Sequence, residues 1–162
     1  MSNNMFLKFT GGPVTIEGET LDSTHEKWVD IESFSWGAHH PATIAHGTGA
    51  SSGASTPSEF IFMKKVDSAS HSLLQALVQA AHVETVNLEV MKTSSGGTTY
   101  AWYKCELSPC MITTFQSGGS GDPYMESVTI AFGKAKFTYT PQDQKGEPLP
   151  EKEVEHDFQA AT

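Results

Sequence analysis

The clearest hydrophobic pattern in the chain lies between residues 115 and 142. Apolar side chains stand at positions 128, 130 and 132, which is typical of a β-strand with one buried face. After Gly133 they stand at positions 135, 137 and 139, so the pattern has moved by one residue. Such a change turns the side chains to the other face of a strand, and it predicts a β-bulge at Gly133. We therefore expect one long, bent strand that serves two packing surfaces and ends before Pro141.

Further runs of β-forming residues predict strands at 5–10, 28–37, 60–66, 86–90, 99–107 and 111–115, with Pro109 between the last two. The run 28–37 carries Val29 and Ile31 on one face and Phe34 and Trp36 on the other. Strands that are apolar on both faces do not suit a free-standing sandwich, in which each sheet has one wet side. They favour a mostly-β barrel whose outer wall is covered by a helix or by a second subunit.

One helix is predicted, at about 69–82, with Leu73 and Leu77 on its apolar stripe and Ser68 or Ser70 as its cap. The segment 39–58 consists mainly of Gly, Ala, Ser, Thr and Pro, and we expect it to be a long loop that orders against a partner.

Two parts of the chain differ in composition. Residues 1–142 are expected to form the barrel domain, and the charged, proline-containing residues 143–162 are expected to form a C-terminal tail. The tail is predicted to be exposed and to end in a short docking segment at 154–158.

The length and the net charge of the chain argue against some classes of function. The 162 residues suit one domain, and the formal net charge of −9, with 10 Lys and Arg in total, argues against a nucleic-acid partner. No apolar run approaches the ~20 residues of a membrane span, so no membrane insertion is expected. The N-terminal residues lack the pattern of a signal peptide, which predicts synthesis in the cytoplasm and export, if any, by another route.

The candidate metal ligands are weak. His39, His40 and His46 lie in the predicted loop, which supplies neither a fourth ligand nor a rigid frame. Cys105 and Cys110 fit no common zinc spacing, and reduced thiols are the default for a cytoplasmic protein. A disulfide across this short turn is the open alternative and would need favourable geometry. No metal and no other cofactor is expected.

Catalytic patterns are equally weak. His25 could be combined with Asp22 and Glu26 in a hydrolytic site, but no nucleophile elbow accompanies them. The glycine-rich run 118–121 is followed by neither a Lys-Ser/Thr pair nor a helix, so it predicts a loop tip rather than a phosphate cradle. We expect no enzymatic activity.

Ser33 and Ser35 alternate with Phe34 and Trp36 in a strand otherwise built for packing. They place small hydroxyl groups where a solvent face would normally carry charge. Two interpretations stay open: an ordinary exposed strand face, or the wall of a cavity between subunits that contacts cargo.

Several motifs resemble the Hcp (haemolysin-coregulated protein) family. The N-terminal signature is Gly18–Gly37, GETLDSTHEKWVDIESFSWG. The later motifs are Phe62–Asp67 (FMKKVD), Gly118–Ser120 (GGS) with Glu126, and Phe132–Gln142 (FGKAKFTYTPQ). They cover nearly the whole chain in the order typical of the family.

The resemblance implies a barrel of two packed sheets with one α-helix, assembled into hexameric rings. Such rings stack into the inner tube of the bacterial type VI secretion system, beneath a VgrG-type spike and inside a contractile sheath, and they carry or chaperone effectors in the lumen. The protein would be made in the bacterial cytoplasm and then secreted without a signal peptide. The implied lumen contacts are Ser33 and Ser35, and the implied protomer or ring-stacking contacts are Thr43, Ile44, His46 and Thr48.

An alternative from another class is a monomeric β-sandwich module that binds a carbohydrate or a peptide. Trp28, Trp36 and Trp102 would then be the stacking surfaces.

Overall fold

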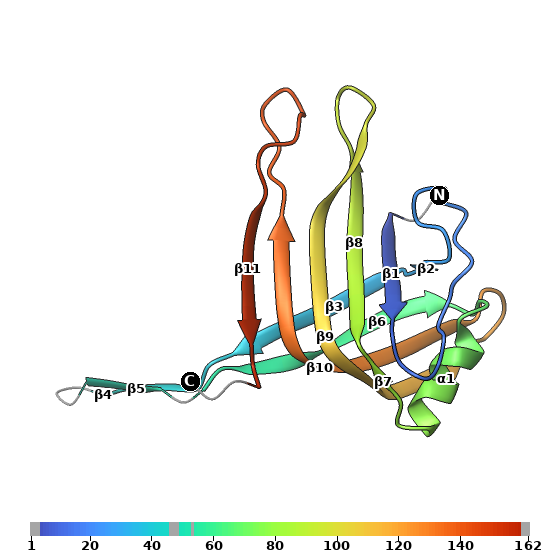
Figure 1. Ribbon diagram of the computed structural model, residues 1–162, viewed down its shortest axis with the longest axis horizontal. Helices are drawn as coiled ribbons and strands as arrows, with labels where there is room; N and C mark the ends of the chain where they lie inside the picture. The colour runs from blue at the N-terminus through green and yellow to red at the C-terminus, as the bar shows by residue number, and fades with distance from the viewer. Residues whose placement is uncertain (1–3, 46–48, 53, 160–162) are drawn as a thin grey trace.

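The computed structural model describes residues 4–45, 49–52 and 54–159, and for 43–45 and 49–52 it describes the backbone only. These residues form eleven strands and one helix (Figure 1). In chain order the elements are β1 (Met5–Thr10), β2 (Val29–Asp30), β3 (Ser33–His39), β4 (Ala42–Ala45), β5 (Gly49–Ser52), β6 (Thr56–Lys65), α1 (Ser70–Val78), β7 (His82–Val83), β8 (Thr85–Thr93), β9 (Thr99–Gly118), β10 (Met125–Tyr139) and β11 (Lys152–Asp157). The chain is mostly β, as the sequence predicts.

Two long strands, β9 and β10, build both layers of the domain (Figure 1). They pair with each other along almost their whole length. The first part of β9 pairs with β8 and the last part of β10 pairs with β11, and these strands form one layer together with β1 and β2. The first part of β10 pairs with β6, and β6 pairs with β3, which gives the second layer. The two expected sheets are therefore two layers of one nine-stranded sheet that bends over itself.

The phase change in β10 is confirmed, but the predicted bulge at Gly133 is wrong. The residue pairs on both sides of Gly133 keep one register with β9, so no extra residue is inserted there. Both strands exchange their inward and outward positions together because both pass from one layer to the other at this point. The register shifts instead between Thr129 and Ile130, opposite Thr113 of β9.

The single strand predicted at 28–37 is divided into β2 and β3. The break lies at Ile31 and Glu32, where the chain crosses between the layers. The amide of Ile31 donates to the carbonyl of Met5 in β1 at 3.1 Å, and the amide of Glu32 donates to the carbonyl of Met63 in β6 at 2.7 Å. This crossing is the physical reason for the phase change in the sequence.

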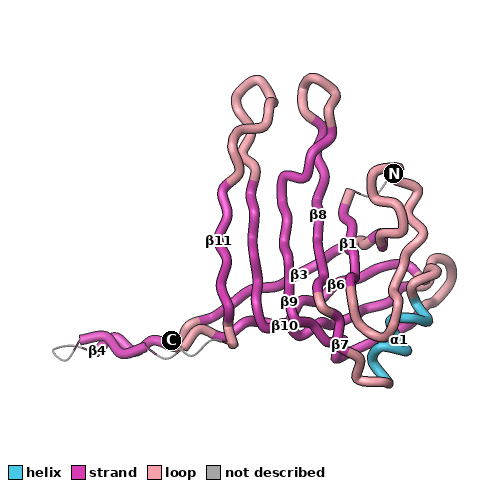
Figure 2. Tube along the Cα trace, in the orientation of Figure 1, coloured by secondary structure: helices cyan, strands magenta, loops and turns pink. Residues whose placement is uncertain are grey.

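The segment 39–58, expected to be a loop, contains strands. β3 continues to its start and β6 begins before its end, and between them β4 and β5 pair as a hairpin that extends away from the body (Figure 2). Small side chains give no hydrophobic period, so the pairing of backbone groups in this hairpin leaves no trace in the sequence pattern.

The helix α1 is shorter than predicted and ends at Val78. Ala80 adopts a left-handed backbone conformation with φ of 49°, which stops the helix before residue 82. Neither predicted serine caps it; the Asp67 carboxylate instead accepts from the amide of Ala69 at 2.9 Å. Leu73 faces the core as predicted. Among the described residues, no helix has the length and apolarity needed to cross a membrane.

The C-terminal segment adds an exposed strand, β11, to the sheet. β11 pairs with β10 over six residue pairs, and Phe158 packs edge-to-face on Phe132. The amide of Phe158 donates to the carbonyl of Gly133 at 2.8 Å, and the Gln159 side chain occupies the place that a Cβ at Gly133 would need. The glycine therefore serves the docking of the chain end.

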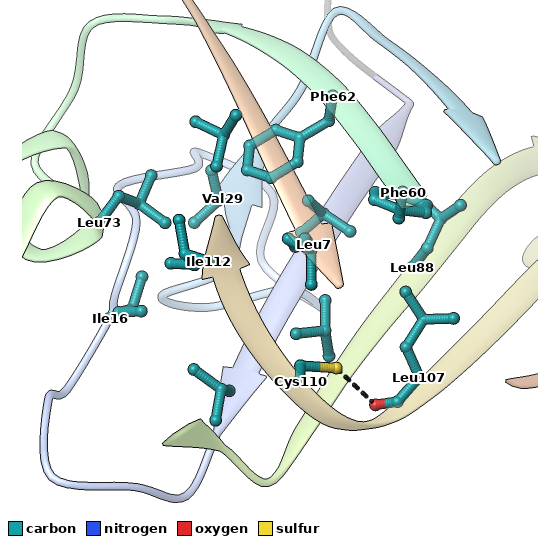
Figure 3. Close-up of a cluster of buried hydrophobic side chains, with 14 of the residues drawn as sticks. Leu7, Ile16, Val29, Phe60, Phe62, Leu73, Leu88, Leu107, Cys110 and Ile112 are labelled. Carbon is teal, nitrogen blue, oxygen red and sulfur yellow. Dashed lines mark hydrogen bonds between the residues drawn. The ribbon is translucent and has the colours of Figure 1, made fainter. Parts of the chain in front are cut away.

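The core lies between the two layers, and Figure 3 shows part of it. The break predicted at Pro109 does not occur, because the neighbour of β9 changes from β8 to β7 there and no ladder donor is needed. Cys105 and Cys110 are free and buried, and burial raises the pKa of both thiols to about 12. The Cys110 thiol donates to the carbonyl of Leu107 at 3.2 Å (Figure 3).

Candidate functional site

One face of the second layer is built from uncharged side chains. Residues directly opposite each other in an antiparallel sheet point to the same side, and the pairing of β3, β6, β10 and β9 gives two rows across this face. We call these eight residues the neutral wall: Ser33, Met63, Ser127 and Gln116 in one row, and Ser35, Ile61, Thr129 and Thr114 in the other.

Charges begin only at the margins of the neutral wall. Lys65 follows Met63 on the same face of β6 and lies 3.8 Å from the Glu32 carboxylate, and Glu59 precedes Ile61. Within the wall Ile61 and Met63 are each 41% exposed, and hydroxyl-bearing residues surround them. The wall therefore offers two apolar contacts in a polar but uncharged surrounding.

Ser33 and Ser35 lie on this wall because their neighbours point inward. Phe34 stacks on Phe60, and the Trp36 indole N–H donates to the Tyr103 hydroxyl at 2.8 Å. The alternation read from the sequence thus places both serines on the exposed side of β3. Ile61 and Met63 were missed, although the same alternation in β6 carries the signal.

The second layer also has open edges. Among the described strands, β3 pairs only with β6, and β9 beyond Met111 pairs only with β10. The pairing groups on the outer side of β3 and along Ile112–Gly118 therefore have no strand partner within the described part of the chain. A free edge on each side of one layer is a surface that a second chain can continue.

Two of the other predicted contact residues fall on the hairpin. Thr43 and Ile44 lie in β4, where the backbone alone is described, and they pair with Ser51 and Ala50 of β5. His46 and Thr48 lie outside the described residues. A contact role for these four positions stays a prediction.

The outer side of the first layer forms a charged face. One row runs through Glu155, Lys136, Glu106, Asn87 and Lys8, so that opposite charges alternate across the strands. In the same face Lys134 pairs with Glu155, and their hydrogen bond raises the pKa of the lysine and lowers the pKa of the carboxyl. The two layers thus present surfaces of opposite character, one charged and one neutral.

A buried ion pair joins the two central strands of the second layer to the start of α1. The Lys64 side chain is 0% exposed, and its ammonium group donates to Glu126 at 2.6 Å, to Asp67 at 2.7 Å and to Ser70 at 3.1 Å. Lys64 and Glu126 are also direct partners in the pairing of β6 with β10. Two of the motifs that resemble the Hcp family therefore meet in one structural network.

The histidine considered for hydrolysis is a buried structural residue. His25 stacks on Phe6, and its two ring nitrogens lie 3.0 Å from Asp22 and 2.8 Å from Glu89. The hydroxyl and the amide of Thr24 also donate to the Asp22 carboxylate. Hydrogen bonds from Thr24 and His25 lower the pKa of Asp22 to about 2. The cluster ties the loop before β2 to β8, and its Thr24 hydroxyl donates to the Asp22 carboxylate at 2.6 Å.

We expect Asp22→Asn to change how stability depends on pH. A carboxyl whose pKa is lowered on folding contributes fully above its unfolded pKa, near 3.8, and loses that contribution as the pH falls through about 2. The wild type should therefore lose stability relative to Asp22→Asn between about pH 4 and pH 2. Urea unfolding at a series of pH values measures this, and parallel profiles for the two proteins would contradict it.

The residues of the other candidate sites, for a metal and for a stacked ligand, do not come together in the described structure. No three His, Cys, Asp or Glu side chains converge on a metal position in the parts of the chain that the structure describes. The three tryptophans do not share one stacking surface: Trp36 contacts Phe132 and Phe137, Trp102 contacts Tyr139, and Trp28 packs on His25.

Comparisons with known proteins agree with this geometry. A family model described as type VI secretion system effector, Hcp, matches residues 6–139. The chain is similar to a solved type six secretion system protein, at 25% identity over 96% of each chain with a TM-score of 0.84. It is also similar to Hcp1 from Salmonella typhimurium, at 22% identity over 98% of this chain and 96% of that chain, with a TM-score of 0.76. A type VI secretion system effector from Yersinia pestis is 23% identical over 94% of this chain and 98% of that chain, with a TM-score of 0.69. A comparison with curated protein sequences finds no match.

Proposed function

Since this chain belongs to the Hcp family of type VI secretion proteins, we propose that its neutral wall lines the lumen of a ring of six protomers. Members of the family are structural tube proteins of that secretion system and not enzymes. The interpretation as a tube component is therefore supported over the alternative of a monomeric binding module. The finer assignment of surfaces to the lumen, to neighbouring protomers and to other rings is our proposal.

The neutral wall is the observation that supports the lumen assignment. Its eight positions carry no charge in a chain with 10 basic and 19 acidic residues. A wall without charge neither repels nor traps a protein of either sign, which suits a conduit for cargo. The short side chains of Ser33 and Ser35 project little into the lumen. Ile61 and Met63 supply weak apolar contacts with an effector.

The free edges of the second layer support ring closure. The outer edge of β3 and the edge of β9 along Ile112–Gly118 lie on opposite sides of one four-stranded layer. Contact between two different surfaces of identical chains generates a ring when the rotation closes. Bringing the β3 edge of one protomer beside the β9 edge of the next would leave no open edge in the second layer of the ring.

The β4–β5 hairpin is proposed to contact a neighbouring protomer or ring. It extends away from the body (Figure 2), and β4 carries the predicted contact positions Thr43 and Ile44. The predicted contacts His46 and Thr48 follow β4 in the sequence and belong to the same proposal. Such contacts between rings should be weak enough for an expelled tube to come apart and release cargo.

Further partners and the route follow from family membership as proposals. The tube would lie beneath a VgrG-type spike and inside a contractile sheath, with the charged face directed outward. Effector proteins would travel in the lumen. The protein would be made in the bacterial cytoplasm and leave by sheath contraction without a signal peptide.

The test is the substitution Ser35→Gln. A longer side chain on the neutral wall should leave the ring mass unchanged and lower the amount of effector that co-purifies with it, because the larger group occupies the contact surface. The readout is mass spectrometry of proteins that co-purify with the tagged ring from its host bacterium. Glu106→Gln, on the charged face, is the matched control and should retain effectors as the wild type does. Equal retention by both variants would contradict the lumen assignment.

A further inference from the structure

The core face of the first layer is not fully covered within one protomer. One row of this face runs through Leu7, Leu88, Cys105, Phe137 and Val154. Leu7 is 0% exposed and Val154 is 62% exposed, so the row begins in the core and ends at a solvent-exposed side chain.

The next row of the same face also becomes more exposed toward β11, but it ends at a charged residue, Lys152. It pairs Tyr139 with Lys152, and Tyr139 is 39% exposed. Phe137 keeps contact with Trp36 and Tyr103 on its inner side. We call Tyr139 and Val154, with the outer side of Phe137, the β11 patch.

A second apolar surface lies on the helix. Leu74 is 44% exposed and Val78 is 68% exposed, and they are four residues apart, so they lie on one face of α1. No charged residue occurs between Ser68 and Ala81. We call Leu74 and Val78 the α1 patch. Its exposure has no cause within the protomer, because Leu73 and Ala76 already supply the contacts of α1 with the core.

The two patches have the placement that a ring needs. A cyclic ring is closed by contacts between two different surfaces on opposite sides of each chain. β11 and α1 lie on opposite sides of the body in Figure 1. Both patches are apolar in a chain whose net charge is −9, so each matches the other better than it matches the charged face.

We propose that the β11 patch of one protomer packs against the α1 patch of the next protomer in the ring. The inference rests on the proposed ring and adds the surfaces that join its members outside the free strand edges. Val154 and Tyr139, which lie in two neighbouring rows of the core face, would then be covered by Val78 and Leu74 of the neighbouring copy.

Two single variants test the contact. Val154→Asp places a charge in the β11 patch and Val78→Asp places one in the α1 patch, and both positions are exposed in the protomer, so folding should be kept. Each variant should have an average mass about six-fold lower than the wild type in sedimentation equilibrium. Glu153→Gln, on the opposite face of β11, is the control and should keep the wild-type mass. The milder variants Val154→Thr and Val78→Ser replace the first pair if circular dichroism shows a loss of structure, and they should weaken assembly in the same direction.

A mixture of the two variants tests whether the patches are each other's partners. Val78→Asp retains an intact β11 patch and Val154→Asp retains an intact α1 patch, so one junction can form between them and no further one. The mixture should reach a mass of two chains as its concentration rises, while each variant alone stays at one chain.

The outcomes separate this inference from the proposed ring. A wild type that stays monomeric would overturn the ring itself. If the wild type forms a ring and either single variant is still hexameric, the patch contact alone is overturned. The same holds if a variant loses effectors but keeps the hexameric mass. Monomeric single variants whose mixture remains monomeric would show that the two patches do not bind each other, and would overturn the pairing.

Discussion

Replacing Lys64 with methionine is expected to lower the free energy of unfolding by about 3–5 kcal/mol, because it leaves a buried carboxylate without its partner. Glu126 is 1% exposed, and the Lys64 ammonium lies 2.6 Å from its carboxylate oxygen. The hydroxyl of Ser70 would remain as a donor to this carboxylate, but it carries no charge. Urea unfolding at one fixed protein concentration measures the loss, since assembly makes stability depend on concentration.

The double variant Lys64→Met with Glu126→Leu is the matched control. Replacing a buried ion pair by apolar residues of similar volume is often close to neutral. The double variant should therefore regain most of the stability that the single variant loses. A single variant that loses less than about 1 kcal/mol would mean that water reaches Glu126, and that the pair is not buried as described.

Phe62→Ala is expected to cost about 3–5 kcal/mol, the range for removing a buried aromatic side chain. Phe62 is 0% exposed and lies among Phe9, Phe34 and Phe60 in the core. The cavity would be surrounded by strands of both layers, which limits its collapse.

Met63→Ala tests the opposite face of the same strand. Met63 follows Phe62 directly but lies on the neutral wall, so its truncation should cost about 0.5 kcal/mol or less in the free energy of unfolding of the protomer. Both variants are compared by urea unfolding under equal conditions. Similar losses at the two positions would contradict the assignment of core and wall to the two faces of β6.

The sequence could predict those parts of the fold in which side chains alternate strongly. The period of two in β10, its change of phase and the pattern of β3 each follow from which residues must be buried. For the same reason the exposed side of Ser33 and Ser35 follows from the neighbouring Phe34 and Trp36.

Other features depend on partners that a single run of sequence does not reveal. The register shift opposite Thr113 and the continuity of β9 through Pro109 are set by neighbouring strands. The β4–β5 hairpin is held by backbone pairing between mostly small residues, and Ile44 alone makes no hydrophobic period. β11 alternates acidic residues with Val154 and His156, and its weak apolar signal reflects a face that the protomer leaves uncovered.

The buried ion pair was missed although the sequence carries its signal. Lys64 continues the inward positions of Phe60 and Phe62, and Glu126 begins the inward series of β10. A lysine and a glutamate at core positions of two strands predict a buried pair once those strands are known to be neighbours, and that pairing was the missing information.

The central claim is that this protomer is completed by copies of itself in a closed ring. The most direct measurement is the mass of the purified full chain by multi-angle light scattering at micromolar concentration. We expect about six times the chain mass of 17.5 kDa. A single species at 17.5 kDa, with both open edges of the second layer in water, would contradict it.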